Sequence, residues 1–265
     1  MRFLVVGAHP DDCEYRFAGT TIKLAAQGHA VKYLSVTNGD AGHHVDGGAS
    51  LVARRKKEAE EGARRAGAVA CETLDNQDGE YEPTLANRRE IIRQIREWKA
   101  DVVLTHRPYD YHPDHRYTAM LVQDSAFMVT VPNICPVTPA LRQNPIFLYL
   151  EDNSQKPMPF RPDIVVDITD TWEKKVETMD AHTSQFYEWL PWLEDKLDEV
   201  PPDPIERKKW LSLYLQRVLV NDFHEMVESR YGKERASEAK FVEGFEVCEY
   251  GRQPSPEELD RIFPR

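Results

Sequence analysis

Hydrophobic positions in the first half of the chain alternate between short uninterrupted runs and longer stretches with apolar residues at helical spacing. An uninterrupted run is typical of a strand buried on both faces, and helical spacing is typical of an amphipathic helix. The pattern predicts strands over residues 3–6, 31–36, 69–74 and 101–106, and helices over residues 18–27, 51–65, 88–99 and 118–128. Because alternating strands and helices form βαβ units, we expect an α/β fold with a mainly parallel central sheet.

Local signals mark the ends of two of these helices. Gly28 and Gly67 directly follow apolar-periodic stretches, and glycine is the usual residue just past the end of a helix. Ser50 precedes the charged stretch over residues 51–65, so we expect its side chain to cap that helix.

Beyond Pro132 the pattern becomes less regular. Apolar runs predict strands over residues 146–150 and 164–168, and a helix is expected to begin near Thr169. A further helix is predicted over residues 205–227.

We expect residues 1–265 to form one domain, with a less typical, helical C-terminal portion from about residue 186. The tail from Val247 is polar and contains three prolines. It is expected to wrap the surface or contact a neighbouring subunit.

Composition narrows the class of protein. The chain has 34 basic and 45 acidic residues, a net charge of −11, which disfavours nucleic acid and anionic membranes because phosphate binding relies on clustered Lys and Arg. No stretch approaches the roughly 20 apolar residues of a membrane span, and the N-terminal apolar run is too short for a signal peptide. The four cysteines are scattered without a CxxC pair. We therefore expect reduced thiols and a cytoplasmic protein that acts on a small molecule.

Two polar clusters lie directly after predicted strands. The first comprises His9, Asp11, Asp12 and Glu14, and the second comprises His106, Asp110, His112, Asp114 and His115. Ligands of open α/β sheets bind outside the carboxyl ends of the strands, so both clusters are expected to face one crevice. Imidazole and carboxylate together suit Zn²⁺ or Fe²⁺ better than Mg²⁺ or Ca²⁺.

The spacing within the clusters suggests a ligand set. His9 and Asp12 are three residues apart in a tight turn and can hold one ion from the same side. A catalytic zinc uses three protein ligands and leaves one position for water, and His115 is the natural third ligand. We therefore predict one Zn²⁺ per chain, with Fe²⁺ or another divalent transition metal as the alternative.

The remaining members of the clusters are predicted to take part in catalysis. Asp11 lies beside the ligands and is expected to act as the general base toward water. His112, in its protonated form, is expected to stabilise a developing oxyanion. Asp114 is expected to orient His112.

Other residues have an ordinary structural interpretation. His106 is expected to make a structural hydrogen bond, and Asp110 is equally compatible with loop capping and with support of the ligands. His43 and His44 are expected to lie in a solvated loop, with a mobile lid as the alternative. His182 has no partner cluster in the sequence. The nearby aromatic residues are expected to pack in the core or at a subunit contact, with stacking on a sugar ring as the alternative: Phe186, Tyr187, Trp189 and Trp192.

Several segments resemble the PIG-L/LmbE-like family of zinc-dependent N-acetylglucosaminyl deacetylases. AHPDDCE, residues 8–14, resembles the AHPDDxE signature of that family, and HPDH, residues 112–115, resembles its second signature. Three loop and helix segments resemble further family motifs in matching order: TNGDAG at 37–42, RKKEA at 55–59 and LDNQDG at 74–79. AHTSQ at 181–185 resembles a C-terminal motif, so the likeness covers about residues 1–186.

The resemblance implies a Rossmann-like α/β sandwich that removes an acetyl group from an N-acetylglucosamine-like sugar or glycoconjugate. It implies the same zinc ligands, His9, Asp12 and His115, and the same general base, Asp11, as the two polar clusters. It adds Arg55 near the substrate and, more loosely, Asp78 in the same pocket. Family members that form trimers or hexamers imply a homo-oligomer.

Two other function classes remain open from the residues. A two-metal phosphoesterase needs enough histidine and carboxylate for two ions about 4 Å apart. A non-catalytic module that binds a metal or a nucleotide is the second alternative. The turn GAHPDD lacks the GxGxxG pattern of dinucleotide sites, which argues against nucleotide binding.

Overall fold

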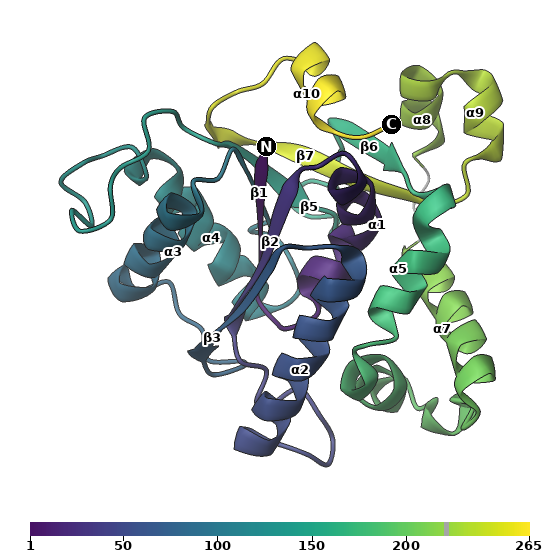
Figure 1. Cartoon of the computed structure of the whole chain (residues 1–265). Helices are drawn as coiled ribbons and strands as arrows, with labels where there is room; N and C mark the ends of the chain where they lie inside the picture. The colour runs from purple at the N-terminus through teal and green to yellow at the C-terminus, as the bar shows by residue number, and fades with distance from the viewer. Residues whose placement is uncertain (220–222) are drawn as a thin grey trace.

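A seven-stranded sheet between two layers of helices organises the chain (Figure 1). The structure is a computed structural model, and it describes residues 1–219 and 223–265. The strands are β1 (Arg2–Gly7), β2 (Ala30–Thr37), β3 (Ala70–Asn76), β4 (Val102–Thr105), β5 (Ile146–Leu150), β6 (Ile164–Asp167) and β7 (Val242–Gly251). Their order is β3-β2-β1-β4-β5-β7-β6, with β7 antiparallel to both of its neighbours and the other pairs parallel. The predicted α/β fold with a mainly parallel sheet is therefore confirmed.

The helices of the described residues flank this sheet. In chain order they are α1 (Asp12–Ala26), α2 (Gly48–Ala66), α3 (Leu85–Trp98), α4 (Pro113–Met128), α5 (Trp172–Met179), α6 (Leu190–Leu193), α7 (Pro204–Leu219), α8 (His224–Tyr231), α9 (Lys233–Glu238) and α10 (Pro256–Ile262). Helices α3 and α4 cover one face of the sheet, and α1, α2 and α5 cover the other (Figure 1).

Strand β1 shows why the apolar runs are uninterrupted. Phe3 and Val5 pack into the core on the side of α1 and α5, whereas Leu4 and Val6 pack into the core on the side of α3 and α4. All four side chains are fully buried. Because successive residues of a strand point to opposite faces, a strand covered on both sides needs an apolar residue at every position.

Two helices begin earlier than the hydrophobic pattern predicts. Helix α1 begins at Asp12 instead of residue 18, and α4 begins at Pro113 instead of residue 118. Proline suits the first position of a helix, and acidic residues in the first turn interact favourably with the helix dipole. Both polar clusters therefore form helix N-termini.

The start of α2 also differs from the prediction. The helix begins at Gly48 after an extended Gly47, so Ser50 lies inside it and the predicted Ser50 cap is wrong. Its other end is as expected, because Gly67 adopts a left-handed conformation with φ 82° and closes the helix.

The C-terminal part differs most from the sequence pattern. The predicted helix over residues 205–227 is confirmed in α7 up to Leu219 and in α8 from His224, but Phe223 lies in neither helix. Residues 220–222 of the prediction lie outside the described residues. The tail from Val247 does not wrap the surface. It starts inside β7, and α10 then inserts Leu259 and Ile262 into the core.

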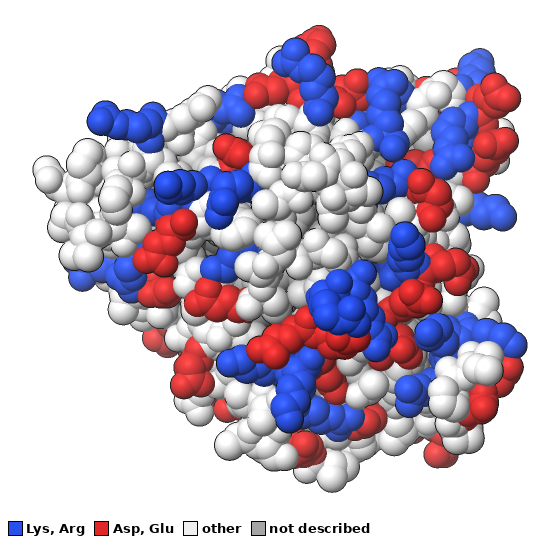
Figure 2. Space-filling model, viewed as in Figure 1, with Lys and Arg blue, Asp and Glu red and all other residues white. Residues whose placement is uncertain are grey.

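The surface shows no single-sign area on the face in view. Basic and acidic side chains are mixed over α2 and α3 (Figure 2). Among the described residues of this face, no continuous positive area offers a phosphate-binding surface. No helix in residues 1–219 or 223–265 is both long and apolar enough to cross a membrane.

One buried arginine joins α3 to the end of α4 and the loop that follows it. Arg96, in the last turn of α3, is fully buried and donates to six backbone carbonyl groups at the end of α4 and in the loop that follows it. The contacts include Nε to Val129 O at 3.0 Å and Nη1 to Thr138 O at 2.9 Å. A single side chain therefore satisfies the polar backbone of this loop.

We predict that Arg96→Met lowers the free energy of unfolding by about 3 kcal/mol, because buried carbonyl groups lose their donors. Chemical denaturation followed by circular dichroism measures the change. Arg89→Met is the matched control, since Arg89 lies on the same helix and is exposed. Equal stability of the two variants would contradict the interpretation.

Candidate metal and catalytic site

Parallel pairing of β1 with β4 brings the two polar clusters together. Val6 pairs with Thr105, so both strands end at the same edge of the sheet. The chain after β1 is fixed there by hydrogen bonds from Thr37 Oγ1 to Ala8 O at 2.8 Å and from Ser35 Oγ to His9 O at 3.1 Å. Residues about 100 positions apart in the sequence therefore meet in one place.

The three predicted metal ligands converge at this edge. Nδ1 of His9 lies 3.1 Å from Nε2 of His115 and 3.4 Å from Oδ2 of Asp12, and Oδ1 of Asp12 lies 3.5 Å from Nε2 of His115. Two imidazole nitrogens and a carboxylate are a donor set that suits a divalent transition metal. The arrangement therefore fits one metal ion.

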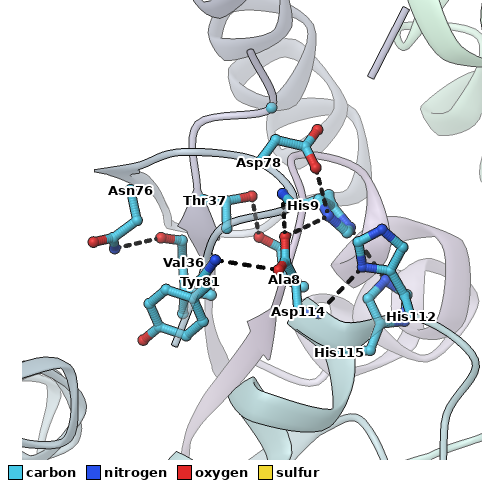
Figure 3. Close-up of polar contacts among 12 residues, drawn as sticks. Ala8, His9, Val36, Thr37, Asn76, Asp78, Tyr81, His112, Asp114 and His115 are labelled. Atoms are coloured by element: carbon cyan, nitrogen blue, oxygen red, sulfur yellow. Dashed lines mark hydrogen bonds and ion pairs between the residues drawn. The ribbon is translucent and has the colours of Figure 1, made fainter. Parts of the chain in front are cut away.

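Each of these imidazole rings has a carboxylate on its far side. Nε2 of His9 lies 3.1 Å from Asp78 and 3.3 Å from Asp114 (Figure 3). Nδ1 of His115 lies 3.1 Å from Asp110, which also accepts a hydrogen bond from the backbone N–H of His112. A carboxylate behind a histidine fixes the orientation of its ring and makes it a stronger metal ligand.

The contacts of Asp114 and His112 differ from the expected pairing. The Asp114 carboxylate lies against His9 and accepts hydrogen bonds from Gly79 N at 2.7 Å and Tyr81 N at 3.3 Å. It is the backbone N–H of Asp114 that contacts His112, by donating to Nδ1 at 3.2 Å. This hydrogen bond leaves the proton of a neutral His112 on Nε2.

The surroundings of His112 favour its neutral form, whereas the sequence interpretation expected the protonated form. Burial, together with the nearby His9 and His115, lowers the pKa of His112. A neutral imidazole with Nε2–H still donates a hydrogen bond to a developing negative charge.

His106 makes the structural hydrogen bond that the sequence predicts. Its Nε2 accepts from the backbone N–H of Ala8 at 3.0 Å, and its ring stacks on His115 with centroids 3.9 Å apart. Nε2 also lies 3.2 Å from Asp12. The residue thereby ties the end of β4 to the end of β1.

Asp11 and Asp12 are adjacent, yet their environments differ. Burial raises the pKa of Asp11, although the Arg55 guanidinium opposes this shift. Burial also disfavours the charged form of Asp12, but His115 and His106 outweigh it and bring the pKa well below its usual value. Asp12 therefore faces the imidazole groups, whereas Asp11 faces Arg55.

Arg55 is enclosed by the loop after β2. Its guanidinium donates to Asp11 at 3.2 Å, to Asp78 at 3.4 Å and to Gly39 O at 3.2 Å. A Cβ atom at Gly39 or Gly42 would lie within 2.7 Å of this guanidinium. The glycines of TNGDAG thus make room for the arginine side chain.

The position of Arg55 bears on its expected role near the substrate. The side chain is only 2% exposed, and neither Arg55 nor Asp78 is among the described residues that line the adjacent cleft. Arg55 instead contacts Asp11, the predicted base, and Asp78 contacts His9, a predicted ligand.

The sequence interpretation missed the partners of the AHTSQ segment. His182 is packed in the interior and fully buried, with Nε2 3.5 Å from Glu14, a contact that the sequence did not reveal. Ser184 donates to Glu58 from its backbone N–H and its hydroxyl group. Both glutamates lie inside segments that resemble family motifs, which was the available signal.

The loop with His43 and His44 is packed, so the expected solvated loop is wrong. Nε2 of His43 lies 2.9 Å from Glu188, which also accepts from Arg54 at 2.8 Å. The His44 ring stacks on Trp192 with centroids 5.2 Å apart. These contacts fasten the loop to the segment that contains α6.

A cleft of about 700 Å³ opens beside the converging ligands. Asp11, Asp12 and His115 lie on one side of it. Its other walls include Phe186, from the aromatic stretch noted in the sequence, and side chains that the sequence interpretation did not single out: Tyr15, Arg16, Glu151, Tyr214 and Arg217. The candidate site is therefore accessible to a small molecule.

Comparison with known proteins agrees with this geometry. The chain belongs to the PIG-L family, whose model, GlcNAc-PI de-N-acetylase, matches residues 4–126. A diacetylchitobiose deacetylase from Thermococcus kodakarensis is 32% identical over 207 residues, covering 72% of this chain and 74% of that protein.

Two further relatives show the range of the likeness. An N,N'-diacetylchitobiose deacetylase from Pyrococcus horikoshii, solved with an inhibitor, superposes with a TM-score of 0.70 at 27% identity, covering 93% of this chain and 83% of that one. A 4-oxalmesaconate hydratase from Pseudomonas putida is 26% identical over 198 residues, covering 70% of this chain and 74% of that protein.

Three groups of described side chains have ligand atoms within 4.8 Å of one another, and none of the three contains His9, Asp12 and His115 together. They are His9–His112–His115, Asp12–His106–His115 and His9–Asp78–Asp114. The last two groups share no residue, so each could hold its own ion. The number of ions bound per chain therefore distinguishes a one-metal site from a two-metal site.

We predict that the purified chain binds one divalent ion and that His115→Ala loses it, because two donors hold a metal less tightly than three. Equilibrium dialysis with elemental analysis measures the stoichiometry. His224→Ala, on the exposed face of α8, is the control and should bind as the unsubstituted chain does. Undiminished binding by His115→Ala would sink this assignment.

Proposed function

We propose that the chain hydrolyses the acetamide of an N-acetylglucosamine-like sugar or glycoconjugate in a Zn²⁺-dependent reaction. The products are acetate and the free amine. The chain is a hydrolase of the N-deacetylase class, as its family and its deacetylase relatives indicate. The observation that carries the proposal is the convergence of His9, Asp12 and His115 beside a cleft that also contains Asp11.

A divalent ion held by these three side chains would polarise the acetamide carbonyl group and lower the pKa of water. His9 and His115 are oriented for this by the carboxylates of Asp78, Asp114 and Asp110. Three protein ligands would leave a further position for water, as a catalytic zinc site requires.

Asp11 is the base in this proposal. Its carboxylate lines the cleft and makes none of the contacts that join the three ligands. It takes a proton from the attacking water and gives a proton to the departing amine, so one carboxylate serves both steps. Arg55 positions it through the contact at 3.2 Å.

His112 supplies a hydrogen-bond donor. Its ring lies edge-on to His9 with centroids 4.7 Å apart, and its Nδ1 is occupied by the Asp114 N–H. Nε2–H is thus free to stabilise the charge that develops on the carbonyl oxygen.

We expect acetate release from N-acetylglucosamine or N,N'-diacetylchitobiose, loss of release after chelation, and recovery on addition of Zn²⁺, because the ion is needed to activate water. Enzymatic acetate detection and amine labelling measure both products. Turnover of 4-oxalmesaconate without acetate release from any N-acetyl sugar would support the hydratase relative's activity instead. Two ions per active chain, together with phosphoester cleavage, would support the two-metal alternative.

We predict that Asp11→Asn retains the fold and the bound ion but lowers kcat by about 10²- to 10⁴-fold, the usual contribution of a general base. Steady-state kinetics and metal analysis of the same sample provide the test. Glu206→Gln, an exposed carboxylate on α7, is the control. A kcat within a few-fold of the unsubstituted enzyme would show that another group takes the proton.

A further inference from the structure

One helical turn separates Asp12 from a second charged residue in the cleft. Arg16 follows Asp12 by four positions on α1, and both residues line the cleft. Residues four apart in a helix lie on the same face, with Cβ atoms about 5–6 Å apart. Arg16 is therefore placed about the width of one sugar ring from the candidate ligands.

The guanidinium of Arg16 has unused hydrogen-bond donors. Its Nη1 is buried and has no hydrogen-bond partner among the described residues. The nearest carboxylate oxygen, on Glu151, is 3.8 Å away, which is longer than a direct hydrogen bond. The ring of Tyr15 lies beneath the guanidinium at 4.7 Å. A buried donor without an acceptor costs free energy, and a bound ligand would remove that cost.

Glu151 faces the same space from the sheet. It directly follows β5, its side chain is 7% exposed, and its carboxyl group accepts no hydrogen bond from the described residues. Burial raises the pKa of Glu151 to about 7, although Arg16 and Lys175 oppose the shift. The group therefore offers a hydrogen-bond acceptor beside the donors of Arg16.

We propose that Arg16 and Glu151 form a subsite for the hydroxyl groups of a neutral saccharide. Arg16 donates to a hydroxyl oxygen, and Glu151 accepts from a hydroxyl hydrogen. This inference rests on the proposed function, because it concerns the sugar whose acetamide reacts. A hydroxyl group is both donor and acceptor, so it satisfies Arg16 and Glu151 in either protonation state of Glu151.

The charge of the cleft supports a neutral substrate. Five carboxylates line it, on Asp11, Asp12, Asp110, Glu151 and Asp152, against two guanidinium groups. The second of these, on Arg217, is 48% exposed and contacts Glu194 at 2.6 Å. A divalent ion would offset two negative charges, and the raised pKa of Glu151 removes part of a third, so the cleft carries no positive excess. An anionic glycoconjugate would therefore gain no net attraction.

Apolar surface in the cleft suits the carbon face of a sugar. Tyr15, Phe186 and Tyr214 line it, with Phe186 and Tyr214 nearly buried. Sites for small molecules typically combine such aromatic walls with a few placed polar groups that fix orientation. Arg16 and Glu151 are those groups on the wall formed by α1 and β5.

The test combines side-chain and substrate changes. Arg16→Met, Arg16→Lys and Glu151→Gln are compared on N,N'-diacetylchitobiose and on its series of single-deoxy analogues. Arg64→Met, an exposed arginine on α2 that pairs with Glu61, is the matched control. If a side chain binds one substrate hydroxyl group, removing either the side chain or that hydroxyl group breaks the contact. Removing both therefore costs no more than removing one.

We expect Arg16→Met and Glu151→Gln to lower kcat/KM by about 10- to 100-fold, mainly through KM, with partial recovery in Arg16→Lys. On the deoxy analogue that lacks the contacted hydroxyl, the same substitutions should cost less than about 3-fold. Equal losses on every analogue would overturn the subsite. The subsite would also be overturned if the unsubstituted chain preferred a carboxylated glycoside to its neutral methyl ester and Arg16→Met lost this preference.

A binding measurement separates this inference from the proposed function. Titration calorimetry with N,N'-diacetylchitobiose on Asp11→Asn chains, with and without Arg16→Met, needs no turnover. Weaker binding in the double variant supports the subsite even if the unsubstituted chain releases no acetate. Absence of acetate release would contradict the proposed function alone. Unchanged binding would overturn the subsite while leaving the deacetylase activity intact.

Discussion

The parallel pairing of β1 with β4 is the constraint on which the candidate site depends. It places His9 and Asp12 at the same sheet edge as His115, and the Ala8–His106 hydrogen bond fixes the two strand ends relative to each other. In a parallel pair both strands end at the same edge, so polar residues after each end become neighbours. Ligand convergence is therefore a consequence of topology, and the local turns only adjust it.

Concentrating carboxylates at one edge is costly unless each has a partner. Desolvation disfavours the charged form of a buried carboxylate, which then takes up a proton. The structure answers this with Arg55 between Asp11 and Asp78, and with backbone N–H groups of the β3–α3 connection on Asp114. The glycines that admit Arg55 thus serve the charge balance of the site as well as the loop conformation.

The sequence predicted the layers, and it brought forward the three candidate ligands, because both depend on local patterns. Continuous apolar runs identified β1 and β4, and polar clusters directly after them identified His9 and His115. Helix starts at Asp12 and Pro113 were placed late, since the residues there are polar for chemical reasons and break the apolar period. Strand β7 was missed because its pairing with β5 and β6 is set by residues about 80 to 100 positions away.

The candidate ligands and part of the proposed subsite come from different parts of the chain. The candidate ligands lie within the family-matched residues 4–126, whereas Glu151, Phe186 and Tyr214 on the cleft walls lie beyond them. The two parts are joined through α1. Buried Lys175 donates to Tyr15 O, and Glu243 accepts from the backbone N–H groups of Gly19 and Thr20 in the same helix. Because Asp12 and Arg16 share that helix, the C-terminal part fixes the orientation of a candidate metal ligand and of the proposed subsite together.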